Sequence, residues 1–131
     1  MRLLVDTQVI LWWKQGSRSL GRRARIAIGQ EASLVFVSTA SAWEIALKSR
    51  AGRLSLSEPL HHWMPGELER EGFLMLNVTA DHVNGLAALP DHHEDPFDRL
   101  LIAQARHEGL TIVTADPVFQ AYGVSVVDAR V

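Results

Sequence analysis

Two carboxylates stand three residues apart at the start of an apolar segment, in the run Asp95-Pro96-Phe97-Asp98. Asp95 is typical of a helix N-cap, proline suits the first helical position, and Asp98 then falls in the first turn. Residues 100–105 are almost entirely apolar, which predicts a buried helix. Acidic side chains at a helix N-terminus are explained either by the helix dipole, which favours negative charge there, or by a bound divalent cation.

Three further acidic residues follow a predicted strand and lie at or near the start of the next predicted helix, namely Asp6, Glu44 and Asp116. In open α/β sheets, ligands bind outside the carboxyl ends of the strands, at the point where the strand order reverses. Asp98 stands at a helix N-terminus that can face the same crevice. We therefore expect these four carboxylates to meet at one edge of a sheet.

Each acid, taken singly, has a simpler explanation as a helix cap. Asp6 and Asp116 fit N-cap positions, and Ser41-Ala42-Trp43-Glu44 matches a capping box with serine at N-cap and glutamate at N3. A cap can also hold a ligand, so the two explanations do not exclude each other. Four carboxylates at one edge would repel and raise one another's pKa unless a cation lay among them. An all-oxygen site of this kind suits Mg²⁺ or Mn²⁺.

The composition is that of one ordinary globular domain. The chain has 131 residues, of which 47% are hydrophobic and 21% are charged. The formal net charge of −2 excludes a strongly basic nucleic-acid coat protein, but not an enzyme with a local basic rim. No apolar run approaches a membrane span, the charged start does not suit a secretory signal, and cysteine is absent. We therefore expect a single cytoplasmic domain over residues 1–131 without membrane association.

The apolar pattern predicts strands that alternate with helices. The strands are expected at residues 3–5, 34–37, 73–76, 111–114 and 124–127, and the helices at 9–13, 21–30, 42–50, 60–71, 79–89, 96–108 and 117–122. Pro65-Gly66 is expected to bend or break the helix that contains it. This alternation predicts an α/β domain whose mostly parallel central sheet of four to five strands is covered by helices on both faces.

Four segments of the chain together carry a resemblance to a known family. They cover residues 3–7, 41–48, 93–105 and 110–116, and they occur in the family's order. On these segments the chain resembles PIN-domain ribonucleases and, within that group, the VapC-type toxins of toxin–antitoxin pairs. The Asp-Pro-Phe-Asp-Arg block with its following helix is the specific part of the resemblance. Close relatives often have histidine two residues after the first aspartate, where this chain has Gln8.

The resemblance implies metal-dependent cleavage of RNA by a single PIN-like domain, with Mg²⁺ or Mn²⁺ as the cofactor. It implies that Asp6, Glu44, Asp98 and Asp116 form the acidic set. It also implies a small VapB-type antitoxin as partner and, commonly, a homodimer. Our hypothesis is that the cation lowers the pKa of a bound water, and that the resulting hydroxide attacks a backbone phosphorus in line.

Several residues near the acids are expected to support the site or to contact the substrate. Asp95 is expected to cap its helix and support the site rather than bind the cation directly. Thr114 either orients a water or ligand or simply ends a strand, and Thr7 is a further supporting residue. Lys48 either forms an i,i+4 ion pair or meets a substrate phosphate. Arg99 is the arginine nearest the acids and a second candidate for substrate contact.

The histidines and the remaining arginines receive simpler explanations. The adjacent pairs at 61–62 and 92–93 do not suit zinc, because neighbouring histidines point in different directions and no cysteine is present. His93, close to the acids, fits a supporting or loop residue. The arginines at 22, 23, 25, 50 and 53 could form a basic rim for RNA, although a solvated helix face is the simpler explanation.

Two other functions remain open from the sequence. A PIN-like module without catalysis would bind RNA or protein through the same fold, although the presence of all four acids argues against it. A phosphoacceptor signalling domain is also doubly wound and binds Mg²⁺ through acids, but it needs adjacent acids early in the chain and a lysine after a late strand. The only lysines are Lys14 and Lys48, which disfavours this alternative.

Overall fold

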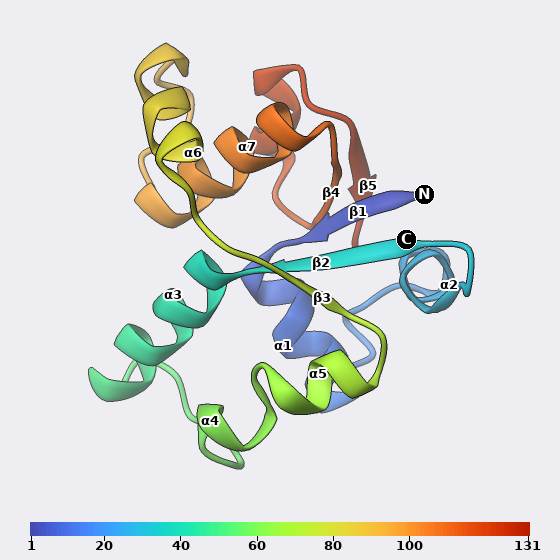
Figure 1. Cartoon of the computed structure of the whole chain (residues 1–131). Coiled ribbons are helices and arrows are strands. Elements are labelled where there is room, and N and C mark those ends of the chain that lie inside the picture. Colours follow the sequence, from blue (N-terminus) through green and yellow to red (C-terminus); the bar gives the residue numbers. More distant parts are fainter.

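A five-stranded sheet forms the centre of the computed structural model, which describes residues 1–131 (Figure 1). The strands are β1 (Arg2–Val5), β2 (Leu34–Ser38), β3 (Leu74–Leu76), β4 (Thr111–Thr114) and β5 (Val126–Asp128). They lie in the order β3-β2-β1-β4-β5, and every neighbouring pair is parallel. The predicted α/β class and the predicted parallel sheet are therefore confirmed.

Helices and short 3₁₀ segments connect the strands. They are α1 (Thr7–Gln15), α2 (Arg22–Gly29), α3 (Thr39–Arg50), α4 (Leu60–Trp63), α5 (Gly66–Arg70), α6 (Ala80–Gly85), η1 (Leu86–Ala88), α7 (Pro96–Glu108) and η2 (Pro117–Tyr122). The predicted helix over 60–71 is divided into α4 and α5 at Pro65, as expected from the missing backbone N–H of proline. None of the helices combines the length and hydrophobicity needed to cross a lipid bilayer.

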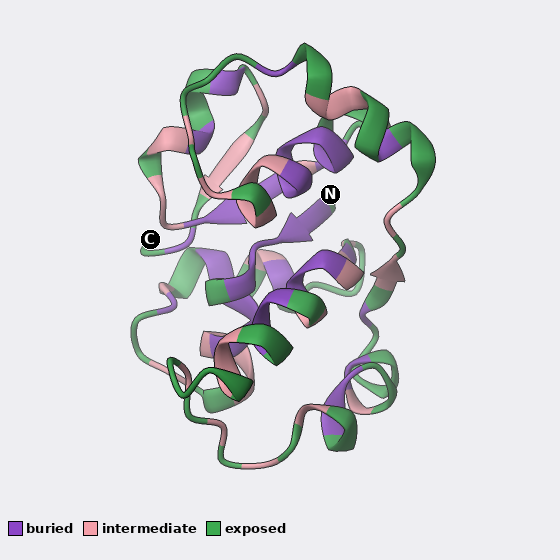
Figure 2. Cartoon of the chain, turned by 90° about the vertical axis from the view of Figure 1, so that its left-hand side faces the viewer, coloured by how far each residue is buried: buried purple, intermediate pink, exposed green.

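Side chains alternate across the sheet and so supply two separate cores. Leu3 and Val5 of β1 pack in a core with residues of α1, α2, α4 and α5. Leu4 packs on the opposite face with residues of α7 and η2. Figure 1 shows α6 and α7 on one side of the sheet and α1, α2 and α5 on the other, and Figure 2 shows the buried strands between these layers. Helices on both faces, as predicted, leave the carboxyl ends of the strands as the place for a site.

The helix α7 is the buried helix that the apolar run predicts. Residues 100–105 are all buried, because the helix packs between the sheet, α3 and α6. The Asp95 side chain caps its N-terminus, and Gly109 ends it with a φ of 68°, which suits glycine. Fully burying one large apolar side chain of this kind stabilises a protein by about 1.5–3 kcal/mol. The first turn of α7 is therefore held in place by the buried body of the helix.

The start of α3 differs from the prediction. The helix begins directly after β2, and the Ser38 side chain accepts a hydrogen bond of 3.0 Å from a backbone N–H of the first turn. The predicted capping box is wrong, because Ser41 lies inside the helix and its hydroxyl accepts a hydrogen bond from Thr7. Glu44 consequently lies in the second turn, beyond the orphan N–H groups that a cap serves. Capping therefore does not explain the presence of this glutamate.

The strand order reverses at β1, which lies between β2 and β4. The backbone N–H of Asp6 donates to the carbonyl of Val113 at 3.1 Å, so the chain that leaves β1 stays against the end of β4. In open α/β sheets this reversal opens a crevice at the carboxyl ends of the strands. The segments that follow β1 and β4 thus face the same space.

Candidate active site

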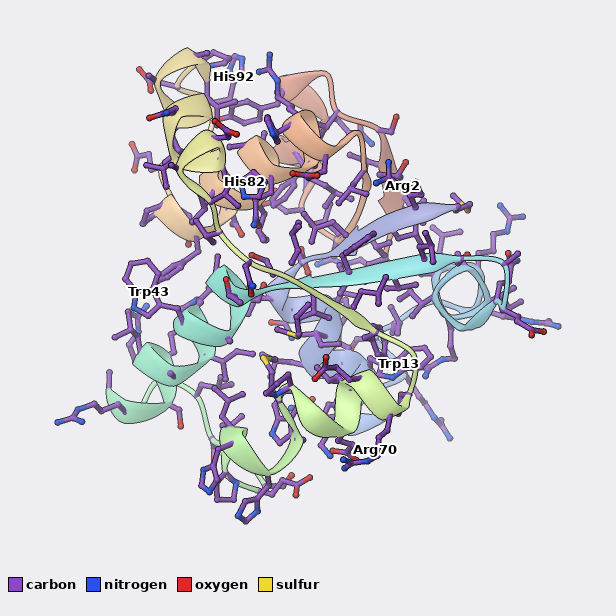
Figure 3. All side chains as sticks on the ribbon, in the orientation of Figure 1. Arg2, Trp13, Trp43, Arg70, His82 and His92 are labelled. Carbon is purple, nitrogen blue, oxygen red and sulfur yellow. The ribbon has the colours of Figure 1, made fainter.

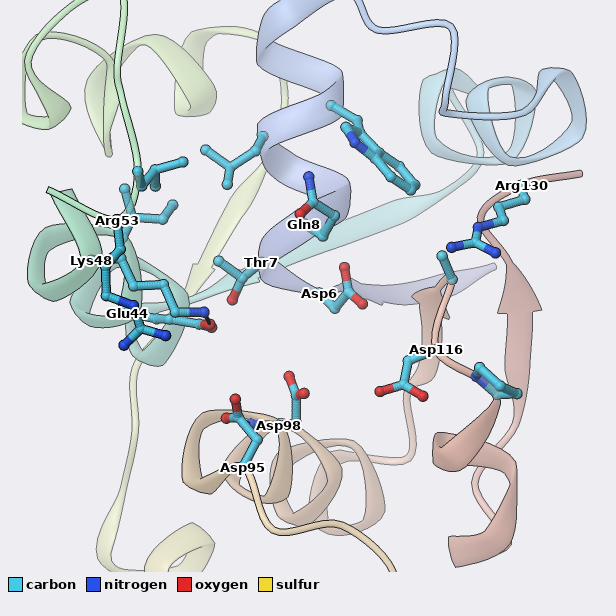
Figure 4. A pocket seen from close by; sticks show the side chains of 16 residues that line it. Asp6, Thr7, Gln8, Glu44, Lys48, Arg53, Asp95, Asp98, Asp116 and Arg130 are labelled. Carbon is cyan, nitrogen blue, oxygen red and sulfur yellow. Dashed lines mark hydrogen bonds and ion pairs between the residues drawn. The ribbon is translucent and has the colours of Figure 1, made fainter.

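A cavity of about 630 Å³ opens at the carboxyl edge of the sheet (Figure 4). Five carboxylates from four segments line it: Asp6 after β1, Glu44 on α3, Asp95 and Asp98 at the start of α7, and Asp116 after β4. The structure thus brings together all four acids of the expected set, with Asp95 beside them. Their roles in chemistry remain a prediction, which the geometry below supports.

Asp6 is buried between β1 and α1. One carboxylate oxygen accepts a hydrogen bond of 2.8 Å from the backbone N–H of Val9, and the other accepts a hydrogen bond from the Thr114 hydroxyl. The pKa of Asp6 is raised to about 6, mainly by burial and to a smaller extent by the charges of Glu44 and Asp116, in spite of these two bonds. The negative charge of the buried Asp6 carboxylate is therefore unfavourable in this position, and a bound cation would stabilise it.

Asp98 lies at the N3 position of α7, as predicted. Burial raises its pKa to about 7, and the neighbouring charges of Asp95 and Asp6 act in the same direction. Two carboxyl groups in one cavity with pKa values raised toward neutrality are typical of a functional site. The expected mutual repulsion of the crowded acids contributes to both raised pKa values, although burial is the main cause.

Glu44 shows most directly that the cavity fits a cation. The residue is 4% exposed, and its Oε2 forms an ion pair with Lys48, which confirms the i,i+4 pair. Its Oε1 is buried and has no hydrogen-bond partner. Leaving such an oxygen unpaired costs about 1–3 kcal/mol or more, because its hydration is lost without replacement. An unpartnered carboxylate oxygen among other carboxylates fits a hard cation such as Mg²⁺ or Mn²⁺.

Thr114 connects two of the acids. Its hydroxyl donates to Asp6, and its Oγ1 accepts a hydrogen bond of 3.1 Å from the backbone N–H of Asp116. The threonine therefore ends β4 and orients Asp6 at the same time. Asp116 in turn caps η2 by accepting a hydrogen bond of 2.9 Å from Val118. Asp95 caps α7 by accepting hydrogen bonds from the first two available N–H groups, as predicted.

Thr7 and Arg99, two further residues that the sequence placed near the acids, lie in different surroundings. The Thr7 hydroxyl donates to Ser41 at 2.9 Å. This bond joins α1, which follows Asp6, to α3, which carries Glu44. Arg99 does not line the cavity. Its guanidinium donates to backbone carbonyls of residues 89, 90 and 93 and to the Tyr122 hydroxyl. The structure therefore uses Arg99 to anchor the loop before α7 instead of placing it where a substrate would bind.

Two arginines that line the cavity were not among the site residues predicted from the sequence, although Arg53 was considered for a basic rim. Arg53 follows α3 and Arg130 lies near the end of the chain, and Figure 4 shows them on opposite sides of the acids. Neither guanidinium forms an ion pair or a hydrogen bond within the chain. Arg53 belonged to a group of arginines with a simpler explanation, and Arg130 lies in no recognisable motif. Only the folded chain shows that both arginines lie beside the acids.

The chain is similar to proteins of one family. A model of the family described as PIN domain matches residues 3–124. Ribonuclease VapC22 of Mycobacterium tuberculosis is 30% identical over 115 residues, which are 87% of this chain and 86% of that protein. The crystal structure of VapBC2 from Rickettsia felis, bound to a DNA fragment from their promoter, matches with a TM-score of 0.72 and 12% identity over 98% of both chains. The structure of DNA-bound VapBC from Salmonella typhimurium gives a TM-score of 0.67 and 17% identity, again over 98% of both.

Proposed function

The chain belongs to the PIN-domain family, and on this premise we propose that it is a metal-dependent endoribonuclease and the toxin of a toxin–antitoxin module. Residues 1–131 are proposed to act as one PIN-like domain. The similarity to a VapC ribonuclease supports cleavage of RNA phosphodiester bonds. The observation that carries the proposal is the buried, unpartnered Oε1 of Glu44 in a cavity lined by four further carboxylates.

Four acids would hold the cation, which we propose to be Mg²⁺ or Mn²⁺: Asp6, Glu44, Asp98 and Asp116. When bound, such a cation supplies an activated water and stabilises the charge that develops on a phosphoryl group. The remaining residues keep the acids in place. Thr114 and the N-terminus of α1 orient Asp6, while Thr7 joins α1 to α3, the helix that carries Glu44. Asp95 holds the first turn of α7 through its two hydrogen bonds.

Chelation of the cation tests this proposal. Purified protein is expected to cleave RNA with Mg²⁺ or Mn²⁺, to lose activity in EDTA, and to regain it when the cation is restored. The measurement is the fragmentation of labelled single-stranded and structured RNAs on a denaturing gel. Cleavage that persists in EDTA would contradict the metal. A protein that binds RNA and Mn²⁺ but cleaves no RNA would instead support a catalytically silent PIN-like module.

The arginines on either side of the acids are proposed to bind the phosphates of an RNA strand that crosses the cavity, with Lys48 as a further candidate. Arg130 is held there by its backbone, because the N–H groups of Gly21 and Arg23 donate to the carbonyls of Ala129 and Val131, each at 2.8 Å. Its guanidinium is free of protein partners, as is that of Arg53 on the opposite wall. Cationic side chains on both sides of an acidic centre suit a polyanion whose reacting phosphate lies at the centre.

Replacing Arg53 or Arg130 with alanine is expected to weaken RNA binding about three- to tenfold and to leave Mn²⁺ binding unchanged. Each lost phosphate contact should reduce the salt dependence of binding to a single strand by a slope of about 0.7. Fluorescence anisotropy with labelled RNA at several salt concentrations measures both quantities. Arg22→Ala, on the exposed side of α2, is the matched control. If both cavity variants bind RNA as tightly as the Arg22→Ala control, the proposed path of the RNA strand across the cavity would be excluded.

We propose that the protein partner is a small VapB-type antitoxin. We also propose that the chain forms a homodimer and that the protein is located in the cytoplasm. Support for the partner comes from structural neighbours that are described as VapBC complexes. Large apolar side chains on α3 are exposed and available for such contacts, with Trp43 57% and Leu47 46% exposed. Trp43 is labelled in Figure 3. Trp43 packs edge-on against Phe97, with ring centroids 4.9 Å apart, so this surface continues onto the start of α7.

A further inference from the structure

The loop that precedes α7 places one imidazole between two of the acids. The Nε2 atom of His93 lies 2.9 Å from Oδ2 of Asp98 and 3.0 Å from Oδ2 of Asp116. Both acids line the cavity, whereas His93 does not. The imidazole therefore contacts the two carboxylates from outside the cavity and links the first turn of α7 to the segment after β4.

A backbone hydrogen bond determines which ring nitrogen carries the proton. The N–H of Asp95 donates to Nδ1 of His93 at 3.2 Å. A ring nitrogen that accepts a hydrogen bond carries no proton, so the proton of this imidazole is on Nε2. Nε2–H thus donates to Oδ2 of Asp116 at 3.0 Å, lies 2.9 Å from Oδ2 of Asp98, and has no lone pair to offer a cation. His93, Asp98 and Asp116 lie close enough together to suggest a metal site, but the histidine supports the acids instead of joining them as a ligand.

The loop is built to hold this ring in one position. The backbone N–H groups of His92 and His93 both donate to the Tyr122 hydroxyl, at 3.0 and 2.7 Å. Arg99 donates to the carbonyl of His93 at 3.3 Å. The imidazole packs edge-on against Phe119, with ring centroids 5.9 Å apart. These contacts give a structural reason for the position of Arg99, which the sequence suggested as a candidate for substrate contact.

We propose that His93 is a positioning residue, whose Nε2 lies between the two acids and holds Asp98 and Asp116 side by side as a prepared pair of cation ligands. The inference rests on the proposed function, which takes these two acids as ligands. Without the imidazole between them, the like charges of these two neighbouring carboxylates would repel and separate. The other oxygen of Asp98 forms no hydrogen bond within the chain and stays available for a cation. Groups that orient metal ligands in this way change metal affinity about 10- to 100-fold.

His93→Ala is expected to weaken Mn²⁺ binding at least about tenfold in isothermal titration calorimetry. The KM for RNA at saturating Mn²⁺ should stay within about twofold, because His93 does not line the cavity. His93→Gln should keep Mn²⁺ affinity within about threefold, since its amide restores a donor at similar reach. His92→Ala is the matched control: its ring packs on Tyr122, with centroids 5.1 Å apart, and forms no ion pair with an acid.

Unchanged Mn²⁺ affinity in His93→Ala would overturn the assignment. If the alanine variant melts at a much lower temperature than the wild type, His93→Gln and His93→Met decide the question. These two side chains have similar volumes, but only glutamine carries a donor. Equal Mn²⁺ affinities would therefore reject the role of the donor at position 93, and weaker binding by the methionine variant would support it. A wild-type protein that binds no Mn²⁺ would overturn the proposed function and this inference together. Normal wild-type binding with no effect at position 93 would overturn only the inference.

Discussion

Replacing Asp98 with asparagine is expected to lower the rate constant of RNA cleavage by about 100- to 1,000-fold, which corresponds to roughly 3–4 kcal/mol of transition-state stabilisation. The amide removes a negative charge from the cavity and offers a single, weaker oxygen to a cation. Asp6→Asn should have an effect of the same size, because Asp6 is buried at the centre of the acids. Single-turnover cleavage of labelled RNA with saturating Mn²⁺ measures the change in the chemical step.

Asp91→Asn is the matched control for these two variants. It makes the same chemical change on a fully exposed side chain and should retain wild-type cleavage. RNA binding by Asp98→Asn should also persist, since the proposed phosphate contacts come from the arginines. Undiminished cleavage by either Asp6→Asn or Asp98→Asn would show that the reaction takes place elsewhere. Membership of the PIN-domain family already excludes the phosphoacceptor alternative.

Lowering the pH from 8 to 5 in EDTA is expected to stabilise the protein. Burial is the main reason that the pKa of Asp6 rises to about 6 and that of Asp98 to about 7, from 3.8 for an ordinary aspartate. Because these pKa values are higher in the folded than in the unfolded state, the folded state binds these protons more tightly. Their contribution to stability is fully present below the unfolded value and is lost as the pH rises through about 6 and 7. The stability curve should therefore fall between pH 5 and pH 8.

The expected size of this effect is about 1–3 kcal/mol, since one pKa unit corresponds to about 1.4 kcal/mol and the two acids interact. For a chain of this length, 1 kcal/mol shifts the melting temperature by roughly 4 °C. Circular dichroism melts at pH 8, 7, 6 and 5 measure the trend. The series stops at pH 5 because the pKa of Glu58 is lowered by its hydrogen bond with Lys14, and that of Glu108 by its hydrogen bond with His82. These acids lose their stabilising effect as the pH falls further.

Two comparisons identify the acidic cavity as the source of this pH dependence. Asp98→Asn should melt at a higher temperature than the wild type at pH 8 and should show a flatter pH dependence, because one repelling charge is gone. Addition of Mn²⁺ at pH 8 should raise the melting temperature of the wild type with increasing concentration, since a ligand of the folded state stabilises it. A melting temperature that increases from pH 5 to pH 8 in EDTA would contradict the raised pKa values of these acids.

Local patterns in the sequence were sufficient to predict the types of secondary structure and the acids that meet at one edge of the sheet. Apolar runs specify the parallel strands, and the Asp95-Pro96 start specifies the N-terminus of α7, because both depend on neighbours in the chain. The position of Asp98 in the first turn of that helix follows from the same local rule. Acids placed directly after β1 and β4 must lie at one edge once the strands are parallel. Four carboxylates could therefore be assigned to one site before any coordinates were considered.

Contacts between distant segments decided the remaining features. Ser38 and Ser41 are equally suitable caps for α3 in sequence, and the burial of Ser41 against Thr7 decides between them. The ion pair of Glu44 was predictable from i,i+4 spacing, but its unpartnered oxygen depends on what surrounds it in the folded chain. The position of Arg130 depends on how the chain end packs against α2. Sequence patterns describe neighbours along the chain, whereas these features arise where residues far apart in the sequence exclude water from one another.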